Sequence, residues 1–127
     1  MIVVNRFAVD DPAFADELAT ALEVLAARPG YLRGSAGRST DDTADWVLVT
    51  EWAGVGDYRR ALGNYQVKLQ ATPVLGRALD QPAAFEQLVF VAPDGTVTRD
   101  ASDRARDPWR RAEAAAQRAV DGSTDRS

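Results

Sequence analysis

The clearest structural signal in this chain is an apolar stretch at residues 45–52, Asp45-Trp46-Val47-Leu48-Val49-Thr50-Glu51-Trp52. Its length and its aromatic and β-branched side chains predict a β-strand. Successive side chains of a strand point to opposite faces, so one face carries Trp46, Leu48, Thr50 and Trp52, and the other carries Val47, Val49 and Glu51. Both faces have apolar bulk, and we therefore expect both to be covered.

Two strands and one helix are expected before this stretch. Residues 2–9 are rich in β-branched and aromatic types and predict the first strand. Asp10-Asp11-Pro12 is typical of a helix start, and the apolar face that follows consists of Phe14, Leu18, Leu22 and Leu25. This helix should end before Arg28-Pro29-Gly30. Residues 31–38 then predict a second strand, which forms an antiparallel hairpin with 45–52 through a polar turn.

A broken helix and a last strand are expected after it. Helical spacing relates Tyr58, Leu62, Tyr65 and Leu69, with an interruption at Gly63-Asn64. Thr72-Pro73 should end this helix, and residues 83–91 predict a strand whose candidate core residues are Phe85, Leu88 and Phe90. The order βαββαβ predicts an α+β domain of ferredoxin-like type, with a four-stranded antiparallel sheet and both helices on one face. The uncovered face then calls for a partner sheet, which predicts a homodimer.

The chain divides into an expected domain, residues 1–92, and a polar C-terminal tail, residues 93–127. The tail begins with the turn sequence Pro93-Asp94-Gly95 and contains a weakly amphipathic segment, 108–120. Partial disorder of the tail and a short helix docked on the dimer both stay open.

Composition excludes several classes of function. The first 92 residues hold eight basic and twelve acidic side chains, and the last 35 hold seven of each, so no basic stripe favours nucleic acid. Without cysteine there is no disulfide, zinc ribbon, iron–sulfur cluster or thiolate nucleophile. Without histidine the usual general base and the commonest transition-metal ligand are missing. The acidic cluster of Asp41, Asp42 and Asp45 fits turn chemistry, and no metal site is expected.

Location is predicted from what the sequence does not contain. No apolar run approaches the roughly 20 residues of a membrane span, so no membrane partner is expected. Arg6 interrupts the short apolar run at the N-terminus, and this pattern does not fit a signal peptide. We therefore expect the protein to be located in the cytoplasm.

Four features together resemble the antibiotic biosynthesis monooxygenase family. They are a first strand containing Asn5-Arg6-Phe7, the helix end Arg28-Pro29-Gly30-Tyr31, the strand end Val49-Thr50-Glu51-Trp52, and Tyr58 six residues later. The resemblance covers about residues 1–91. It implies ferredoxin-like protomers whose sheets pack face to face as a dimeric α+β barrel. The same frame hosts several functions, so the resemblance indicates the fold more sharply than the activity.

Two branches of that family can be compared with the chain. The cofactor-free branch, which oxidises anthrone-like polyketides with O2, is similar at Trp52 and Tyr58, but this chain has Leu48 where that branch has an asparagine. The haem-degrading branch is similar at Asn5, but its expected tryptophan falls near Ala61 and its haem-ligating histidine near Gln70. Haem is disfavoured as a cofactor, and no cofactor is expected; without histidine, iron would need an oxygen ligand such as Tyr65.

These considerations predict a site for a small aromatic, anthrone- or quinone-like molecule. Asn5, Trp52 and Tyr58 are its candidate catalytic residues. Phe7 and Leu48 are expected as apolar walls, and Tyr65 and Gln70 as hydrogen-bonding residues. No strong base is evident, and a tyrosine, a buried carboxylate such as Glu51, or solvent stay open for proton removal.

Three function classes stay open at this stage. They are a cofactor-independent monooxygenase, a dimer that holds haem or a hydrophobic ligand without catalysis, and a structural or regulatory dimeric module. Each candidate residue also has an ordinary structural role, since strand tryptophans are common in cores and Asn5 could bond the backbone of its neighbours.

Overall fold

The structure is a computed structural model that describes residues 1–100. Its contacts divide the chain into two compact units, Met1–Phe85 and Glu86–Ser127, each of which is considered by itself. The tail segment 108–120, for which a helix was weighed, lies outside the described residues. Within residues 1–100, no helix has the length and apolar character that crossing a membrane requires.

The first unit contains a four-stranded antiparallel sheet in the order β2-β3-β1-β4. Its strands are β1 (Ile2–Ala8), β2 (Tyr31–Arg38), β3 (Asp45–Trp52) and β4 (Ala84–Phe85). The central pair is β1 and β3, in a register that places Asn5 opposite Leu48. With the helices inserted after β1 and β3, this is the predicted ferredoxin-like α+β fold.

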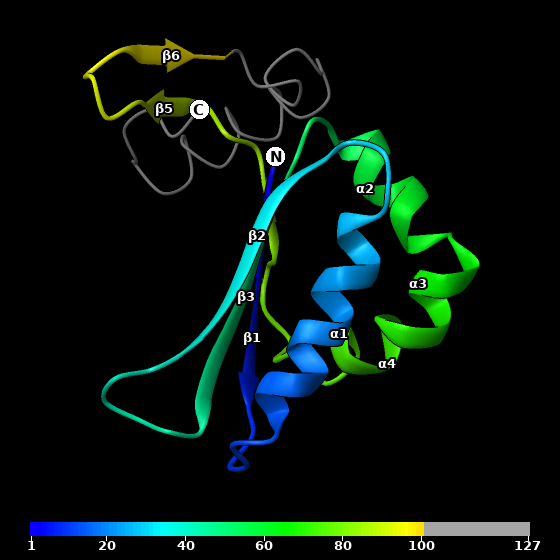
Figure 1. Ribbon diagram of the computed structural model, residues 1–127. Coiled ribbons are helices and arrows are strands. Elements are labelled where there is room, and N and C mark those ends of the chain that lie inside the picture. The colour runs from blue at the N-terminus through cyan, green and yellow to red at the C-terminus, as the bar shows by residue number, and fades with distance from the viewer. Residues whose placement is uncertain (101–127) are drawn as a thin grey trace, which may run out of the picture. The chain divides into compact units, whose positions relative to one another are not determined.

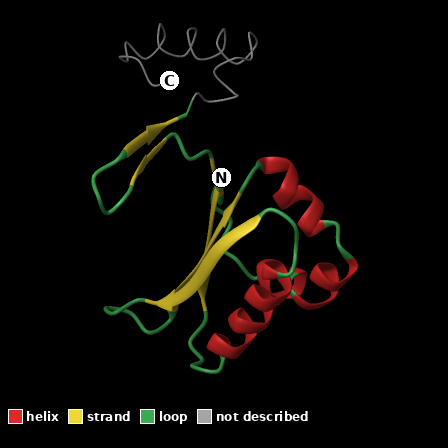
Figure 2. Ribbon diagram, turned by 45° about the horizontal axis from the view of Figure 1, so that its top comes forward, coloured by secondary structure: helices red, strands yellow, loops and turns green. Residues whose placement is uncertain are grey.

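All helices of the first unit cover one face of the sheet, as Figures 1 and 2 show. They are α1 (Phe14–Ala26), α2 (Val55–Leu62), α3 (Tyr65–Gln70) and α4 (Thr72–Leu75). The predicted break after α2 is confirmed at Gly63-Asn64. Asn64 restarts the helix, because its side-chain oxygen accepts hydrogen bonds from the backbone N–H groups of Gln66 and Val67 at 3.0 and 3.2 Å. Pro73 lies in the first turn of α4, where its missing N–H costs nothing.

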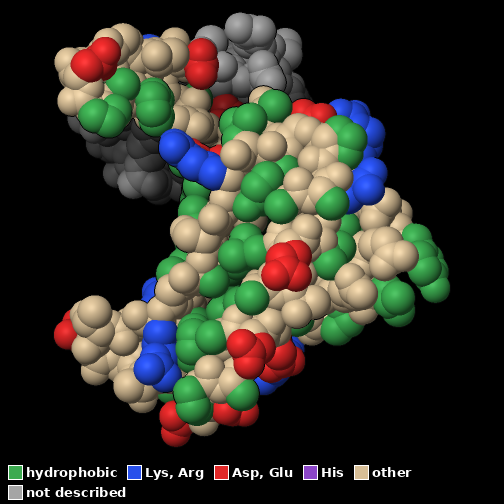
Figure 3. Space-filling view, viewed as in Figure 1, with side chains coloured by type: hydrophobic (Ala, Val, Ile, Leu, Met, Phe, Trp, Pro, Cys, Tyr) green, Lys and Arg blue, Asp and Glu red, His purple; other side chains and the backbone are tan. Residues whose placement is uncertain are grey.

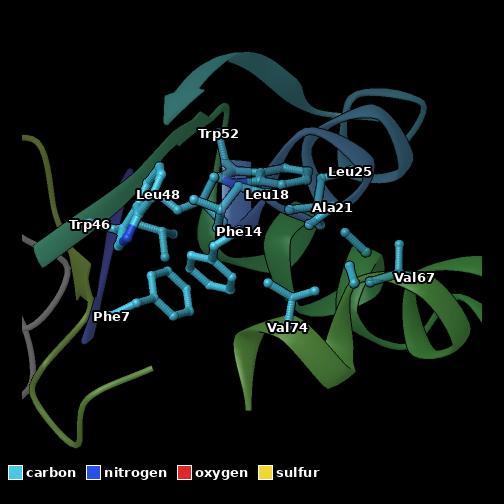
Figure 4. Close-up of a cluster of buried hydrophobic side chains, with 13 residues drawn as sticks. Phe7, Phe14, Leu18, Ala21, Leu25, Trp46, Leu48, Trp52, Val67 and Val74 are labelled. Carbon is cyan, nitrogen blue, oxygen red and sulfur yellow. The ribbon is translucent and has the colours of Figure 1, made fainter. Parts of the chain in front are cut away.

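The hydrophobic core lies between the sheet and these helices (Figure 4). The strand face predicted to be buried is buried, since Trp46, Leu48, Thr50 and Trp52 are at most 6% exposed. From α1, the core receives Phe14, Leu18, Ala21 and Leu25. Figure 4 shows Trp46 and Phe7 toward one end of this core and Trp52 beside Leu25 toward the other.

The opposite face of β3 is partly exposed within the first unit. Val47 and Val49 are half-buried there, and Val4 and Ile2 of β1 share the face by register. Its charges are paired: Arg33 contacts Glu51, and Arg6 Nη2 lies 2.6 Å from Asp45 Oδ2. We call this surface, formed by Ile2, Val4, Val47, Val49 and Glu51, the open face.

The last predicted strand, residues 83–91, is divided in the structure. Only Ala84–Phe85 joins the sheet, and Val89–Val91 (β5) pairs instead with Val97–Arg99 (β6) in the second unit. The turn between β5 and β6 contains Gly95 at φ +89° and a 2.8 Å hydrogen bond from Thr96 N–H to the Asp94 carboxylate, whose pKa it lowers. The predicted core role of Phe85, Leu88 and Phe90 is wrong, since they are 46%, 38% and 37% exposed. The alternation of apolar residues predicted that this segment joins the four-stranded sheet. The short turn after Val91 instead lets β5 pair with the strand that follows it in the chain.

Candidate functional site

The core end at Trp52 is an aromatic cluster of three rings. Tyr31 from the start of β2 packs perpendicular to Trp52, with ring centroids 5.4 Å apart and planes at 87°. Tyr58 from α2 packs on the same indole at 5.4 Å and 53°. Such edge-to-face and tilted contacts are favourable for aromatic rings. Tyr31, Trp52 and Tyr58 are referred to below as the aromatic cluster.

The indole N–H of Trp52 is already occupied. Trp52 Nε1 donates to Thr50 Oγ1 at 2.9 Å, and both residues are almost fully buried, at 1% and 3% exposure. Breaking this bond without a replacement would leave a buried donor unpaired, which is costly. Trp52 therefore supplies an apolar wall to its surroundings, and hydrogen bonds for a ligand must come from neighbouring groups.

The two tyrosine hydroxyls of the cluster are free for such a role. Neither makes a hydrogen bond to any residue between 1 and 100, and no unpaired side-chain oxygen or nitrogen in that range is fully buried, so both reach solvent. Partial burial raises the pKa of Tyr58 and of Tyr31. Both hydroxyls therefore stay protonated at neutral pH and act as hydrogen-bond donors.

Tyr58 is positioned by the loop that follows β3. Gly54, in extended conformation, precedes α2, and the backbone N–H of Tyr58 bonds the Gly54 carbonyl at 3.4 Å. Trp52 and Tyr58 thus come from the end of a strand and the first turn of the next helix. The structure brings these two candidate residues into ring contact.

Asn5, Leu48 and Phe7 lie farther along the same face of the sheet. Asn5 is directly opposite Leu48, and Phe7 follows two residues after Asn5 on the same face. Leu48 is four residues from Trp52, which corresponds to about 13 Å along a strand. Leu48 and Phe7 are at most 1% exposed and belong to the core, whereas Asn5 is half-buried. The Asn5 amide makes no side-chain hydrogen bond within residues 1–100 and is available to a ligand.

Tyr65 and Gln70 lie on the solvent side of α3. Tyr65 is 71% exposed, and Gln70 is also exposed. Val67 is the residue of α3 that enters the core. In this form of the protomer, the two residues are part of the outer surface, so a role in binding requires a ligand or partner that reaches that surface.

The charged groups around α2 are paired or solvated. Arg60 Nη2 lies 2.8 Å from Asp57 Oδ1, three residues earlier in the same helix. Figure 3 shows Lys and Arg side chains gathered over α2. Among the residues that the structure describes, no group of three or more His, Cys, Asp or Glu side chains is placed to hold a metal ion.

Tyr31 is the residue that sequence reasoning did not assign to the site. Strand alternation counted back from Arg33 does not place Tyr31 against Trp52, because an irregularity in the pairing intervenes. Two sequence signals pointed to it: its position directly after Pro29-Gly30, where a chain reverses direction, and its place in the family-like helix end Arg28-Pro29-Gly30-Tyr31.

Solved structures with the same fold include those of an oxygenase and of a mycobacterial protein. Two structures of SnoaB, a cofactor-independent oxygenase from Streptomyces nogalater, match with 26% and 28% identity and TM-scores of 0.59 and 0.54. They cover 68% and 61% of this chain and 91% and 82% of SnoaB. Rv0793 from Mycobacterium tuberculosis, at 19% identity and a TM-score of 0.52, shares the fold over 65% of this chain and 86% of its own.

None of the curated proteins matches the chain. A family model does match, over residues 1–68, which is more than half of the 127 residues and includes β1 through α2, with Asn5, Trp52 and Tyr58. The chain therefore belongs to the antibiotic biosynthesis monooxygenase family.

Proposed function

We propose that this protein is a cofactor-independent monooxygenase that oxidises a small aromatic, anthrone- or quinone-like metabolite with O2. The observation that carries the proposal is the packed pair of Trp52 and Tyr58, which combines an apolar wall with a protonated hydroxyl. The likeness to SnoaB, an oxygenase that needs no cofactor, supports it.

An oxygenase that uses no cofactor takes the electrons for O2 reduction from its substrate, after the substrate loses a proton to become an electron-rich anion. Because the chain has no histidine or cysteine, proton removal falls to a tyrosine, a carboxylate or solvent. For an anthrone, the ring CH2 and one O2 yield a ring carbonyl and one water, so the substrate is oxidised and no reductant is consumed. The protein's part is to orient the substrate, exclude water and donate hydrogen bonds to its anionic oxygen.

Asn5 is proposed to supply the amide that Leu48 does not. The cofactor-free branch has an asparagine at the position of Leu48, and here Asn5 lies directly opposite that position on the neighbouring strand. Directly paired residues of antiparallel strands have Cβ atoms about 5 Å apart, so an amide moved one strand over stays on the same face. Because Trp52, Leu48 and Phe7 are at most 1% exposed, a ligand that reaches Asn5 or the indole must displace part of this packing. Tyr65 and Gln70 would contact such a ligand at its outer end.

The active form is proposed to be a homodimer that stacks the open faces of two protomers. The resemblance to this family implies protomers whose sheets pack face to face. The open face carries four half-buried aliphatic residues, and the charged side chains beside them form ion pairs within the protomer. A second copy can therefore cover this face without burying an unpaired charge. Association of this kind would also enlarge the small core of an 85-residue unit.

Oxygen consumption with 1,8-dihydroxyanthrone tests the proposed activity. Wild-type protein should consume O2 and form the anthraquinone at a rate well above the spontaneous oxidation of the anthrone. Asn5→Ala should lower the rate about tenfold or more, whereas Gln66→Ala, a change of an exposed α3 side chain, should leave it unchanged. No consumption above the spontaneous rate with this anthrone and with a set of related anthrones would refute the proposed activity.

A further inference from the structure

An irregularity in the pairing of β2 with β3 brings Tyr31 to Trp52. Arg33 is paired with Glu51, so regular pairing would place Leu32 opposite Trp52. The register shifts between Tyr31 and Arg33, and Tyr31 takes the position opposite Trp52 instead. Leu32 is left 63% exposed. The strand therefore gives up the burial of a leucine and places a tyrosine against the indole, and bulges often re-aim a side chain in this way next to functional sites.

The same strand also leaves room for the tyrosine's hydroxyl. A Cβ at Gly34 would lie 2.5 Å from Tyr31 Oη and 2.9 Å from Leu22 Cδ2. Cβ atoms essentially never approach non-bonded heavy atoms within 3.0 Å, so a side chain at position 34 would force the hydroxyl and the leucine to shift. Gly34 is thus required for the present position of the Tyr31 hydroxyl.

The hydroxyl so placed has no structural use within the described residues. It makes no hydrogen bond to residues 1–100, it reaches solvent, and its ring alone accounts for the contact with Trp52. A phenylalanine would pack on Trp52 equally well. Tyr58, whose hydroxyl is also without a hydrogen bond to residues 1–100, packs its ring on the same indole.

We propose that the Tyr31 hydroxyl is a second hydrogen-bond donor of the site, which binds an oxygen atom of a flat aromatic ligand beside Tyr58 and Trp52. The inference deepens the proposed function, on which it rests, by assigning a ligand-contacting residue. Two phenolic donors suit a ligand with neighbouring carbonyl and phenolate oxygens, whose negative charge they stabilise. The bulge places one donor, and the start of α2 places the other.

Binding of 1,8-dihydroxyanthraquinone tests this role without any oxidation, because the probe is already the oxidised form. Its dissociation constant can be measured by the quenching of tryptophan fluorescence. Tyr31→Phe should weaken binding about fivefold, since one hydrogen bond is lost, while leaving the thermal unfolding temperature nearly unchanged. Gly34→Ala should weaken binding similarly by displacing the hydroxyl, and Gly37→Ala, whose Cβ would meet only Val47 Cγ1 at 3.9 Å, serves as the matched control.

A spectroscopic measurement separates this role from a structural one. Hydroxyl donors stabilise the phenolate of the bound probe, so its phenol should ionise at lower pH when bound to wild-type protein than when bound to Tyr31→Phe. If both proteins bind the probe equally and with the same ionisation, the inference is overturned and the proposed activity is unaffected. If the wild-type protein does not bind the probe at all, the inference is likewise overturned. Binding without oxygen consumption would refute the proposed activity and retain Tyr31 as a ligand contact.

Discussion

Replacing Thr50 by valine tests whether the buried hydrogen bond to Trp52 stabilises the protein. Valine has nearly the shape of threonine, so the change removes the acceptor of the 2.9 Å bond and leaves the Trp52 N–H in a core position that is 1% exposed. An unpaired buried donor costs about 1 to 3 kcal/mol. The added methyl offsets part of this, and we expect a net loss of about 1 to 2 kcal/mol, a large share of the 5 to 15 kcal/mol typical of a domain.

Urea unfolding followed by circular dichroism measures this loss. A double-mutant cycle with Trp52→Phe isolates the bond, since the phenylalanine has no N–H to leave unpaired. Thr50→Val should therefore cost about 1 kcal/mol less in the Trp52→Phe background than in the wild type. A loss below about 0.5 kcal/mol in the wild type, or equal losses in the two backgrounds, would refute the reasoning.

Three further predictions follow from the fold. Gly30→Ala should lower the free energy of unfolding by about 1 kcal/mol or more, because φ is +88° and the new Cβ would lie 2.3 Å from Asp57 Cβ; thermal unfolding checks this, and a loss equal to that of Gly37→Ala would contradict it. Burial raises the pKa of Tyr58, so the folded protein holds the phenolic proton more tightly than the unfolded chain does. The stability that this difference contributes is fully present below about pH 10 and is lost as pH rises through the raised pKa. Between about pH 9 and 12, the thermal unfolding temperature should therefore fall less steeply with rising pH for Tyr58→Phe than for the wild type. Identical slopes for the two proteins would count against this. Val49→Lys on the open face should give a monomer in sedimentation at micromolar concentration, whereas Ala15→Lys on exposed α1 should not; a dimer that survives the Val49 change would place its interface elsewhere.

Local patterns predicted most elements because the forces involved act over a few residues. The alternation in 45–52 placed Trp46, Leu48, Thr50 and Trp52 on the buried face, and all four are buried. The spacing of Phe14, Leu18, Leu22 and Leu25 likewise predicted the core face of α1, where three of these residues are buried and Leu22 is half-buried against the core. The break at Gly63-Asn64 was readable because asparagine and glycine favour such junctions.

The last strand was predicted less well because its partner is chosen over long range. β1 satisfies its outer edge with several short contacts: Leu79 N–H donates to the Arg6 carbonyl, Val4 N–H to the Ala83 carbonyl, and only Ala84–Phe85 pairs as a strand. Val89–Val91 pairs instead with β6, from which only residues 92–96 separate it along the chain. Alternating apolar residues predict a strand but do not identify the strand that it pairs with.

The candidate site likewise combines residues that sequence indicated with residues whose positions depend on long-range packing. The family resemblance indicated Trp52 and Tyr58, and a polar amide within an apolar strand indicated Asn5. The pairing of β1 with β3 then showed that Asn5 lies directly opposite Leu48. The exposure of Tyr65 and Gln70 was not readable, because short helices after a break can rotate by amounts that spacing does not specify.

Composition and periodicity are local properties, so the amino-acid sequence was enough to predict the α+β order, the buried faces of α1 and β3, and the lack of thiol and imidazole side chains. The contact of Tyr31 with Trp52 was visible only in the folded structure. That contact depends on one extra residue in the pairing of β2 with β3 and on the space above Gly34, which arise when distant segments pack together.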